Sequence, residues 1–303
     1  PEVILGQVEE LFDALLTEHP PAGDLWGIGV GVPGPVEFAT GHPISPPIMP
    51  GWEGYPVRER FVERHGVPAW VDNDVNIMAL GEWRDGTAHG HDDFMFVKIG
   101  TGIGSGIVSN GHIHRGAQGS AGDIGHIQVR SERHEICRCG KVDCLEALAG
   151  GAAIARDGLT VAGAGGSERL TAALEEQGAL TARDVIDAAR QGDSAAMRLL
   201  AESATLVGQT LASLANFFNP SLIVIGGGVA HAGDAYLATI RQVIYARSTA
   251  LATRDLQVKL SRLGARAGVI GAASMALDQL FSEKELARWI DAGRPLASAG
   301  AAA

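Results

Sequence analysis

The sequence predicts an α/β protein built on parallel sheets. Short apolar stretches alternate with amphipathic stretches along most of the chain, which is the pattern of repeated strand and helix units. Several apolar stretches end in glycine, proline or asparagine turns, and ligands of open α/β sheets gather at the carboxyl ends of strands. Because 303 residues is long for one domain, we expect two lobes.

Composition narrows the class of protein. Hydrophobic residues make up 46% of the chain and charged residues 19%, which describes a globular protein with an ample core. No apolar run approaches the ~20 residues of a membrane helix, and the start lacks a signal pattern, so we expect a soluble, cytoplasmic protein with no membrane partner. The net charge of −11 argues against nucleic-acid binding by this stretch alone.

The first part of the chain is predicted to form a helix, a strand and a second helix. Apolar residues recur at helical spacing over 2–18, and Pro20-Pro21 ends that helix. Residues 25–32 form a buried strand that runs into Pro33-Gly34-Pro35, which either borders a ligand site or is a plain structural turn. A proline-rich loop precedes the short helix over 56–65.

A cluster of polar residues marks the end of the next strand. The strand over 69–71 stops at Asp72-Asn73-Asp74, and a helix over 75–83 follows directly. Any of the three side chains can cap that helix by accepting hydrogen bonds from its first backbone N–H groups. One cap is enough, so Asp74 is either a further capping residue or a general base that accepts a proton from a substrate.

A glycine-rich hairpin follows. The strand over 93–99 leads into residues 100–108, where glycines alternate with other residues. Such a loop can turn backbone N–H groups toward a phosphate, but it joins two strands and opens no helix, unlike the P-loop and Rossmann motifs. A purely structural hairpin would tolerate larger residues, so the glycines favour phosphate contact. Asn110-Gly111 predicts a further hairpin turn.

The rest of the chain is predicted to be mainly helical. Helices are expected over 147–157, 181–190, 194–218, 236–246 and 267–281, strands over 222–225 and 256–260, a flexible insertion over 162–178 and a frayed end over 298–303. The run Gly226-Gly227-Gly228 lies between a strand and a helix, where a nucleotide or a sugar can approach the backbone closely.

All three cysteines fall in one polar segment. Cys137, Cys139 and Cys144 lie close together, and His126 precedes them. Three thiolates and an imidazole match a tetrahedral zinc ion, and a closed set of this kind is usually structural. Chance clustering of buried cysteines and a disulfide are weaker alternatives, because the segment has no apolar face and a disulfide would leave one cysteine over.

Several stretches together resemble the ROK family of bacterial sugar kinases and sugar-responsive transcriptional regulators. In chain order they are Val32-Pro33-Gly34-Pro35, Pro50-Gly51-Trp52, Asn73-Asp74-Val75-Asn76, Leu80-Gly81-Glu82, Gly100-Thr101-Gly102-Ile103-Gly104, Ala121-Gly122-Asp123-Ile124-Gly125-His126, Cys137-Arg138-Cys139-Gly140, Cys144-Leu145-Glu146 and Ile225-Gly226-Gly227-Gly228-Val229. Each stretch is weak alone, but their order over residues 25–281 is specific, and the Cys-x-Cys-Gly segment is the sharpest.

The resemblance implies an actin-like ATPase (ribonuclease H-like) fold of two lobes with a sugar in the cleft. The first lobe would comprise residues 1–92, without its N-terminal strands and completed by a C-terminal helix over 268–303. The second lobe would comprise residues 93–267, including a zinc loop over 122–146. Because the chain begins with Pro1 rather than Met, we expect that upstream sequence is missing.

The resemblance also assigns roles to individual residues. It implies structural zinc at His126, Cys137, Cys139 and Cys144, and a sugar at Asn73, Asp74, Asp123, His126 and Glu146. In a kinase, Asp74 would be the catalytic base, and ATP with Mg²⁺ would lie against Thr101, Gly102, Gly104, Gly226, Gly227 and Gly228. The zinc ion would act by fixing the loop that carries Glu146 and His126.

Two departures from the kinase pattern bear on function: the first argues against catalysis by this chain as given but fits a kinase and a regulator equally, and the second favours a regulator. Family kinases carry an Asp-x-Gly-x-Thr phosphate loop ahead of the position of residue 2, and this chain lacks it, so half of the phosphate cradle is absent. Asp123 stands where the kinases usually have glutamate, and together with a helical tail over 283–291 it resembles the regulator branch.

We therefore predict the sugar-binding effector domain of a ROK transcriptional regulator. Such a protein would be a homodimer or homotetramer that contacts DNA through a winged helix-turn-helix upstream of Pro1. The alternative is an ATP-dependent sugar kinase of the glucokinase or N-acetylhexosamine kinase type, with Asp74 as general base. A third possibility is a protein that only senses or stores zinc.

Overall fold

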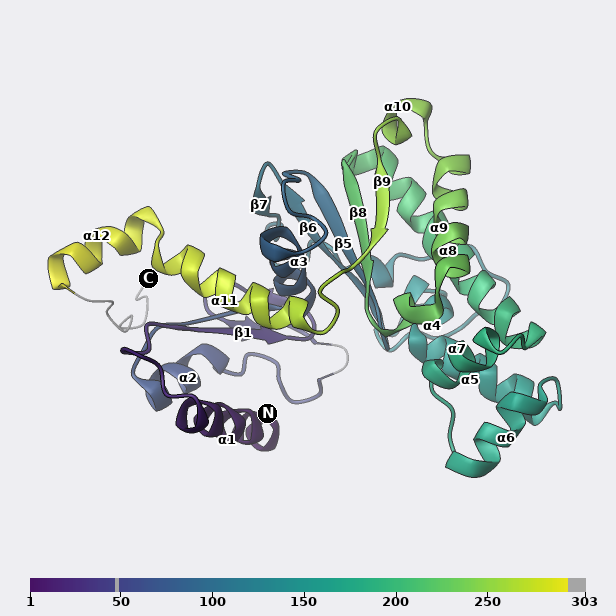
Figure 1. Cartoon of the computed structure of the whole chain (residues 1–303), viewed down its shortest axis with the longest axis horizontal. Helices are drawn as coiled ribbons and strands as arrows, with labels where there is room; N and C mark the ends of the chain where they lie inside the picture. Colours follow the sequence, from purple (N-terminus) through teal and green to yellow (C-terminus); the bar gives the residue numbers. More distant parts are fainter. Residues whose placement is uncertain (47–48, 294–303) are drawn as a thin grey trace.

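The chain folds into two α/β halves that meet at helices α3 and α11 (Figure 1). The computed structural model describes residues 1–46 and 49–293, so the end predicted to be frayed, 298–303, lies outside the described residues. One half is built on a two-stranded parallel sheet and the other on a five-stranded sheet. The predicted α/β class is confirmed.

The first half contains two helices and two strand pairs. α1 (Glu2–Glu18), β1 (Ile28–Val32), α2 (Val57–His65) and β4 (Ala69–Asn73) are its main elements, and β2 (Val36–Glu37) with β3 (His42–Pro43) forms a small antiparallel pair. β1 and β4 pair in parallel over their whole length. α1 is attached to α2 through Arg60, whose guanidinium binds the carboxylates of Glu2 and Glu9.

The second half is organised around a sheet with the strand order β7-β6-β5-β8-β9. Its strands are β5 (Phe94–Ile99), β6 (Ile103–Ser109), β7 (His112–Ile113), β8 (Leu222–Gly226) and β9 (Gln257–Leu260). β5, β8 and β9 run parallel, whereas β6 and β7 are antiparallel to their neighbours. The expectation of parallel sheets is wrong on this side, because short turns after β5 and β6 can join only antiparallel strands.

The helices of the second half fall mostly where they were predicted. They are α4 (Leu145–Ala149), α5 (Gly151–Gly163), α6 (Glu168–Gln177), α7 (Ala182–Arg190), α8 (Ser194–Phe218), α9 (Asp234–Arg247) and α10 (Ala250–Thr253), with short turns η1 (Ile124–His126) and η2 (Gly228–Ala232). The flexible insertion predicted over 162–178 is wrong. Ser167 caps α6 by accepting a hydrogen bond from Leu170 N, and the Leu170 side chain is fully buried.

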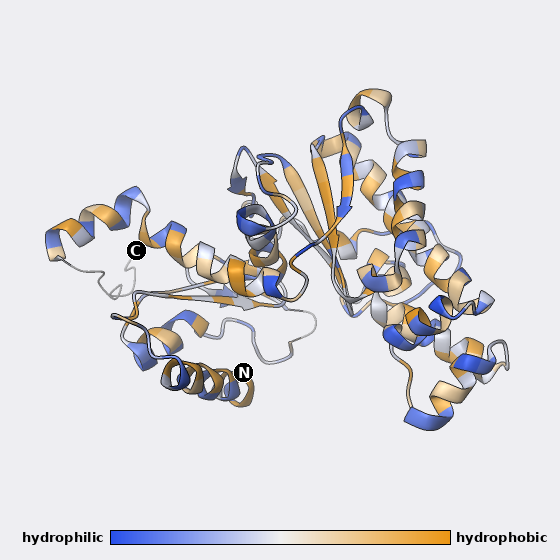
Figure 2. Cartoon of the chain, viewed as in Figure 1, coloured by the Kyte–Doolittle hydropathy of each residue, from blue (hydrophilic) through white to orange (hydrophobic). Residues whose placement is uncertain are grey.

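Hydrophobic residues run along β5 and β8, the central strands of the larger sheet (Figure 2). β8 is buried at every position, and β5 is buried at every position except Lys98. A charged side chain inside so apolar a strand needs a partner, since burying an unpaired charge is costly. We therefore expect Lys98 to have an anionic partner nearby.

α3 (Asp74–Asp85) and α11 (Arg266–Leu280) hold the two halves together. They cross so closely that a Cβ atom at Gly271 would collide with the Ile77 carbonyl oxygen, and one at Gly81 with that of Ala267. α11 also lies against β1, and α3 contacts β5 and β6 (Figure 1). This pair of helices is thus packed against both sheets at once.

A last helix extends beyond this pair. α12 (Glu283–Ala292) confirms the helical tail predicted over 283–291. It is attached through Trp289, whose ring meets that of Trp26 edge-on, with the centroids 5.9 Å apart. Across residues 1–46 and 49–293, no helix is both long and apolar enough to cross a membrane.

Candidate ligand cleft and metal cluster

A cleft of about 1120 Å³ opens where strands of both halves end. The turn after β1, the start of α3, the β5–β6 loop, α7 and η2 all contribute to its lining. Of the predicted site residues, it is lined by Asn73, Asp74, Thr101, Gly102, Gly104, Asp123, His126, Glu146 and Gly228. One small-molecule site occupies about 300–1,000 Å³, so this cleft is slightly larger than one large site and holds two ligands if each needs about half of its volume.

The three polar residues after β4 perform different tasks. Asn73 caps α3, because its Oδ1 accepts hydrogen bonds from two backbone N–H groups at 2.9 and 3.1 Å. Asp72 is 1% exposed and accepts a hydrogen bond from Arg115 Nε at 2.8 Å. The Asp74 carboxylate neither caps α3 nor binds Arg115, and it faces the cleft. Asp74 is therefore not a further capping residue, and its carboxylate is available to contact a ligand, as a general base must be.

Asp74 has a partner that the sequence analysis missed. Lys98 Nζ lies 2.6 Å from Asp74 Oδ2, and both side chains line the cleft. The signal was present in the sequence, since Lys98 is the one charged residue in the apolar stretch Phe94-Met95-Phe96-Val97-Lys98-Ile99. The site thus contains a cation beside the carboxylate that was the candidate base.

Glu146 reaches the cleft from the start of α4. Its Oε2 accepts a hydrogen bond from Ile103 N at 3.0 Å, which fixes the carboxylate against the β5–β6 loop. A Cβ atom at Gly102 would collide with this carboxylate. The glycine at position 102 is accordingly required by Glu146, whatever else it contacts.

Two other glycines of the hairpin, Gly104 and Gly106, also have packing reasons. A Cβ atom at Gly106 would lie 2.7 Å from the Ala79 Cβ, and one at Gly104 3.2 Å from a Val75 methyl group, so both glycines let α3 approach β6. The argument that a structural hairpin would tolerate larger residues is therefore wrong here. It overlooked the helix that packs on the hairpin.

The glycine run after β8 is divided between packing and the cleft. Gly226 lies against Phe96, whose ring would be 2.6 Å from an added Cβ, and Gly227 adopts a positive φ of 89°. Neither residue lines the cleft, whereas Gly228 does. The structure thus brings only one of the three predicted glycines to the candidate site.

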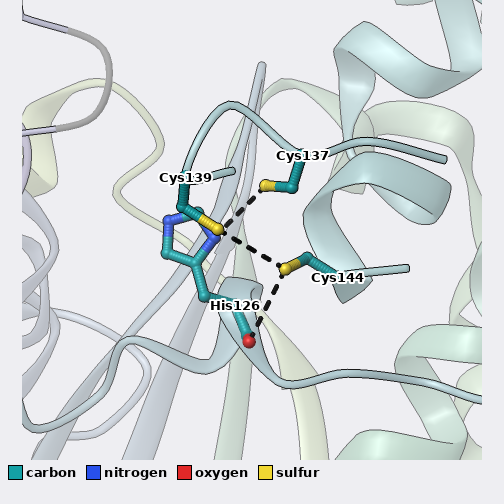
Figure 3. Close-up of side chains that lie close together, drawn as sticks. All are labelled: His126, Cys137, Cys139 and Cys144. Carbon is teal, nitrogen blue, oxygen red and sulfur yellow. Dashed lines mark hydrogen bonds between the residues drawn. The ribbon is translucent and has the colours of Figure 1, made fainter. Parts of the chain in front are cut away.

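The three cysteines and His126 form a compact cluster (Figure 3). Their four ligand atoms all lie within 4.8 Å of one another. Cys139 Sγ and Cys144 Sγ are 3.7 Å apart, and Cys137 Sγ is 3.4 Å from His126 Nδ1. Tetrahedral zinc with bonds of about 2.3 Å to sulfur and about 2.0 Å to nitrogen requires separations of about 3.8 and 3.5 Å. The cluster therefore fits the metal that the sequence predicts.

The loop between the cysteines is shaped to hold this cluster. Cys137 N donates to the Lys141 carbonyl at 2.8 Å, and Gly140 N donates to the Cys137 carbonyl at 2.9 Å, which closes a tight turn around Cys139. Burial raises the pKa of the Cys144 thiol to about 12. A bound cation is what stabilises a thiolate in such surroundings, because it supplies the opposite charge.

His126 connects the cluster to the cleft. Its Nδ1 faces the cysteine sulfurs, and its Nε2 lies 3.9 Å from Asp123 Oδ1. His126, Asp123 and Glu146 all line the cleft, and a metal bound through Nδ1 would leave Nε2 free to meet a ligand. The metal cluster is in this way built into one wall of the cleft.

Fold and cleft together define the class of protein. The two-part α/β architecture is shared with solved ROK sugar kinases, and the chain has the actin-like ATPase fold. Residues 2–279 match the ROK family over nearly the whole chain. The protein belongs to the ROK family, as the sequence motifs predicted.

Relatives of this chain include both kinases and regulators. A glucokinase from Halalkalibacterium halodurans is 38% identical over 91% of this chain and 84% of its own length. A putative xylose repressor from a Caldicellulosiruptor species is 32% identical over 91% of this chain and 69% of its own length. The solved ROK glucokinase of Streptomyces griseus, in complex with glucose and AMPPNP, superposes with a TM-score of 0.77 at 32% identity, covering 89% of this chain and 87% of that one.

The comparisons favour the kinase over the regulator. The preference for a regulator rested on Asp123 and on the tail over 283–291, whereas the missing phosphate loop fitted either function. The Halalkalibacterium glucokinase matches this chain at 38% identity over 84% of its own length, against 32% and 69% for the putative xylose repressor. The sugar kinase, which the sequence analysis gave as the alternative, is therefore better supported than the regulator.

Proposed function

We propose that this protein is an ATP-dependent sugar kinase that acts on a hexose. The observation that carries the proposal is the Asp74 carboxylate, which the Asn73 cap leaves free to face a cleft large enough for a sugar and a nucleotide. Similarity to two glucokinases, one of them solved with glucose and AMPPNP, supports the choice of substrates.

In this mechanism the sugar lies between Asp74 and the wall formed by the metal cluster. The amide of Asn73, the carboxylates of Asp123 and Glu146 and the free nitrogen of His126 bind its hydroxyl groups. Carboxylates suit this task because each oxygen accepts hydrogen bonds from hydroxyl groups that water would otherwise occupy. The nucleotide lies along Thr101, Gly102, Gly104 and Gly228, which line the same cleft.

The chemical step is a transfer of the γ-phosphoryl group. Asp74 accepts the proton of one sugar hydroxyl, the hydroxyl oxygen attacks the γ-phosphorus, and ADP leaves with the bridging oxygen. ATP enters as its Mg²⁺ complex, and that ion neutralises charge on the phosphates. A closed zinc site of four protein ligands leaves no position for water, so we assign zinc a structural role in holding His126 and Glu146.

The test is ADP release by the full-length protein across a panel of hexoses. Asp74→Asn keeps the size of the side chain but removes the base, and we expect kcat to fall by about 100- to 10,000-fold. Asp85→Asn is the matched control, because Asp85 is exposed at the other end of α3. Turnover that survives in Asp74→Asn would reject this mechanism.

A second candidate is the effector domain of a sugar-responsive regulator. It is favoured by the xylose repressor relative, of which this chain covers 69%. In that case the same cleft binds the sugar, while DNA is contacted through a further domain of a homodimer or homotetramer. Sugar-dependent DNA binding by the full-length protein, without turnover that depends on Asp74, would establish this function instead.

A further inference from the structure

We propose that Lys98 binds the phosphoryl group of a ligand in the cleft. Without such a ligand its ammonium group pairs with Asp74. This inference deepens the proposed function and rests on it for the identity of the phosphoryl group, which would be the γ-phosphate of ATP before transfer and the sugar phosphate after it.

The sheet gives Lys98 an open path to the cleft. On β5 it stands in register with Gly104 of β6 on one side and Gly226 of β8 on the other. Neither neighbour has a side chain to cover the lysine stem or to pair with its charge. The side chain remains 33% exposed and lines the cleft.

Asp74 is the partner of the half-buried Lys98 only in the absence of ligand. Lys98 Nζ donates a hydrogen bond to Asp74 Oδ2 at 2.6 Å, and Asp74 Oδ1 accepts a long hydrogen bond from Asn73 Nδ2 at 3.3 Å. A sugar hydroxyl that approaches Asp74 competes with the ammonium group for this carboxylate. Once the hydroxyl is bound, Lys98 needs another anion nearby.

The geometry of phosphoryl transfer supplies that anion. The base accepts a hydrogen bond from the attacking hydroxyl group, and the hydroxyl oxygen lies next to the phosphorus atom that it attacks. An ammonium group that starts 2.6 Å from the base can therefore reach the phosphoryl oxygens by rotating its flexible stem. A lysine acts on phosphate as a mobile point charge, which suits a group that changes partners during a reaction.

Two arginine side chains also line the cleft, but they do not contact Asp74. Arg183 and Arg190 line the cleft from α7, but both lie within 4.0 Å of Asp187 on the same helix. Arg190 also donates to the His231 carbonyl oxygen. Lys98 is the cation that contacts the candidate base itself.

The binding test uses glucose, glucose 6-phosphate and inorganic pyrophosphate as probes, measured by calorimetry on the full-length protein. We expect Lys98→Met to weaken binding of the two phosphate-bearing probes by about 10- to 100-fold, as for loss of a charge-assisted hydrogen bond, and to change glucose binding by less than about threefold. Lys98→Arg should restore part of the loss. Lys259→Met is the matched control, because Lys259 is an exposed lysine on the edge strand β9.

A double-mutant cycle separates this role from mere positioning of Asp74. If Lys98 binds phosphate directly, Lys98→Met still weakens phosphate binding when Asp74 is already Asn, and Asp74→Asn alone strengthens it by freeing the ammonium group. If Lys98 only holds Asp74 in place, the effect of Lys98→Met vanishes in the Asp74→Asn background. That result, or a wild-type protein that binds neither phosphate probe, would overturn the proposal.

Kinetics distinguish this inference from the proposed function. Sugar turnover that depends on Asp74 but is unchanged in Lys98→Met would leave the kinase standing and remove the role of Lys98. Phosphate binding that depends on Lys98, in a protein without turnover, would leave the subsite standing and make a sugar phosphate the ligand of a regulator. In an active kinase we expect Lys98→Met to lower kcat by about 100-fold or more with little change in the KM for the sugar.

Discussion

The Glu146 carboxylate depends on the absence of a side chain at Gly102. The two residues are far apart in sequence, yet the carboxylate fills the space where a Cβ atom at position 102 would lie. Ile103 N, the next amide along the loop, holds the carboxylate there at 3.0 Å. The shape of the sugar side of the cleft is therefore set by a glycine that was predicted for the phosphate side.

We expect Gly102→Ala to weaken sugar binding by about tenfold, because the methyl group displaces Glu146 and breaks one charge-assisted hydrogen bond. The measurement is the dissociation constant for glucose by calorimetry. Gly163→Ala, at the open end of α5 where an added Cβ meets nothing within 4 Å, is the matched control. Unchanged glucose binding in Gly102→Ala would show that Glu146 does not contact the sugar.

At the residue scale the sequence predicts which residue types gather, but not which one does what. The stretch Asp72-Asn73-Asp74 was expected to supply one cap, and only the structure shows that it is Asn73. The choice depends on backbone angles at the end of β4, which propensities do not fix. Lys98 was missed for a related reason, because its partner lies on another element and the register of β5 is not visible in the sequence.

The segment between η1 and α4 carries the candidate metal ligands and leads directly into Glu146, which lines the cleft. It begins at His126 and ends at Cys144, directly before Glu146. Two isolated bridges, Gln128 with Cys144 and Ile136 with Val142, are the only β pairs within its described residues. With so little regular structure in the segment, we expect a bound metal to add to the support that the Ile103 N–H group gives Glu146.

Removal of the metal should reduce sugar affinity before it unfolds the protein. We expect chelation, or Cys139→Ser, to weaken glucose binding by about 10- to 100-fold, because His126 and Glu146 lose their common support. Circular dichroism should still report a folded protein. Lys141→Ala, in the same loop but outside the ligand set, should retain about one zinc ion and normal binding.

Equal glucose binding by chelated, folded protein and by untreated protein would contradict this account. It would separate the metal cluster from the cleft and support a protein in which zinc has its own role. A melting temperature that glucose does not shift, with or without zinc, would point the same way, since a ligand that binds only the folded state must raise it.

Elements were easier to predict than the reasons for their glycines. Strands and long helices showed in the sequence because their apolar residues repeat with a clear period. The helix α6 did not, since the glycine-rich stretch before it resembles a loop and its cap depends on Ser167. Glycines at 226 and 227 matched a ligand-binding pattern, but close packing against β5 accounts for them instead.

At the scale of the whole molecule, the contact between α3 and α11 couples the two halves. Buried Ile77, Leu80 and Met275 form a small core between these helices, separate from the cores of the two sheets. Domain limits at 92, 93, 267 and 268 remain a prediction. The helix pair packs against both sheets, so we expect the halves to unfold together.

We expect Gly271→Ala to lower the free energy of unfolding by about 2 kcal/mol or more, because its methyl group would force α3 and α11 apart. Gly268→Ala is the matched control on the same helix, since its nearest neighbour atom would be 4.0 Å away. It should raise stability by about 0.5–1 kcal/mol, as alanine does in an open helix position. Urea denaturation checks both values, and equal midpoints for the two variants would contradict the close packing.

The same helix has a consequence for how the protein is made. α11 leaves the ribosome about 240 residues after β1, yet the backbone of β1 needs it, because Gly29 lies directly against the Ala272 carbonyl group. At about 5–20 residues per second, the first strand waits on the order of ten seconds or longer for its cover. During that interval a growing chain exposes an unfinished apolar face, and chaperones that shield nascent chains have their longest opportunity to act on it.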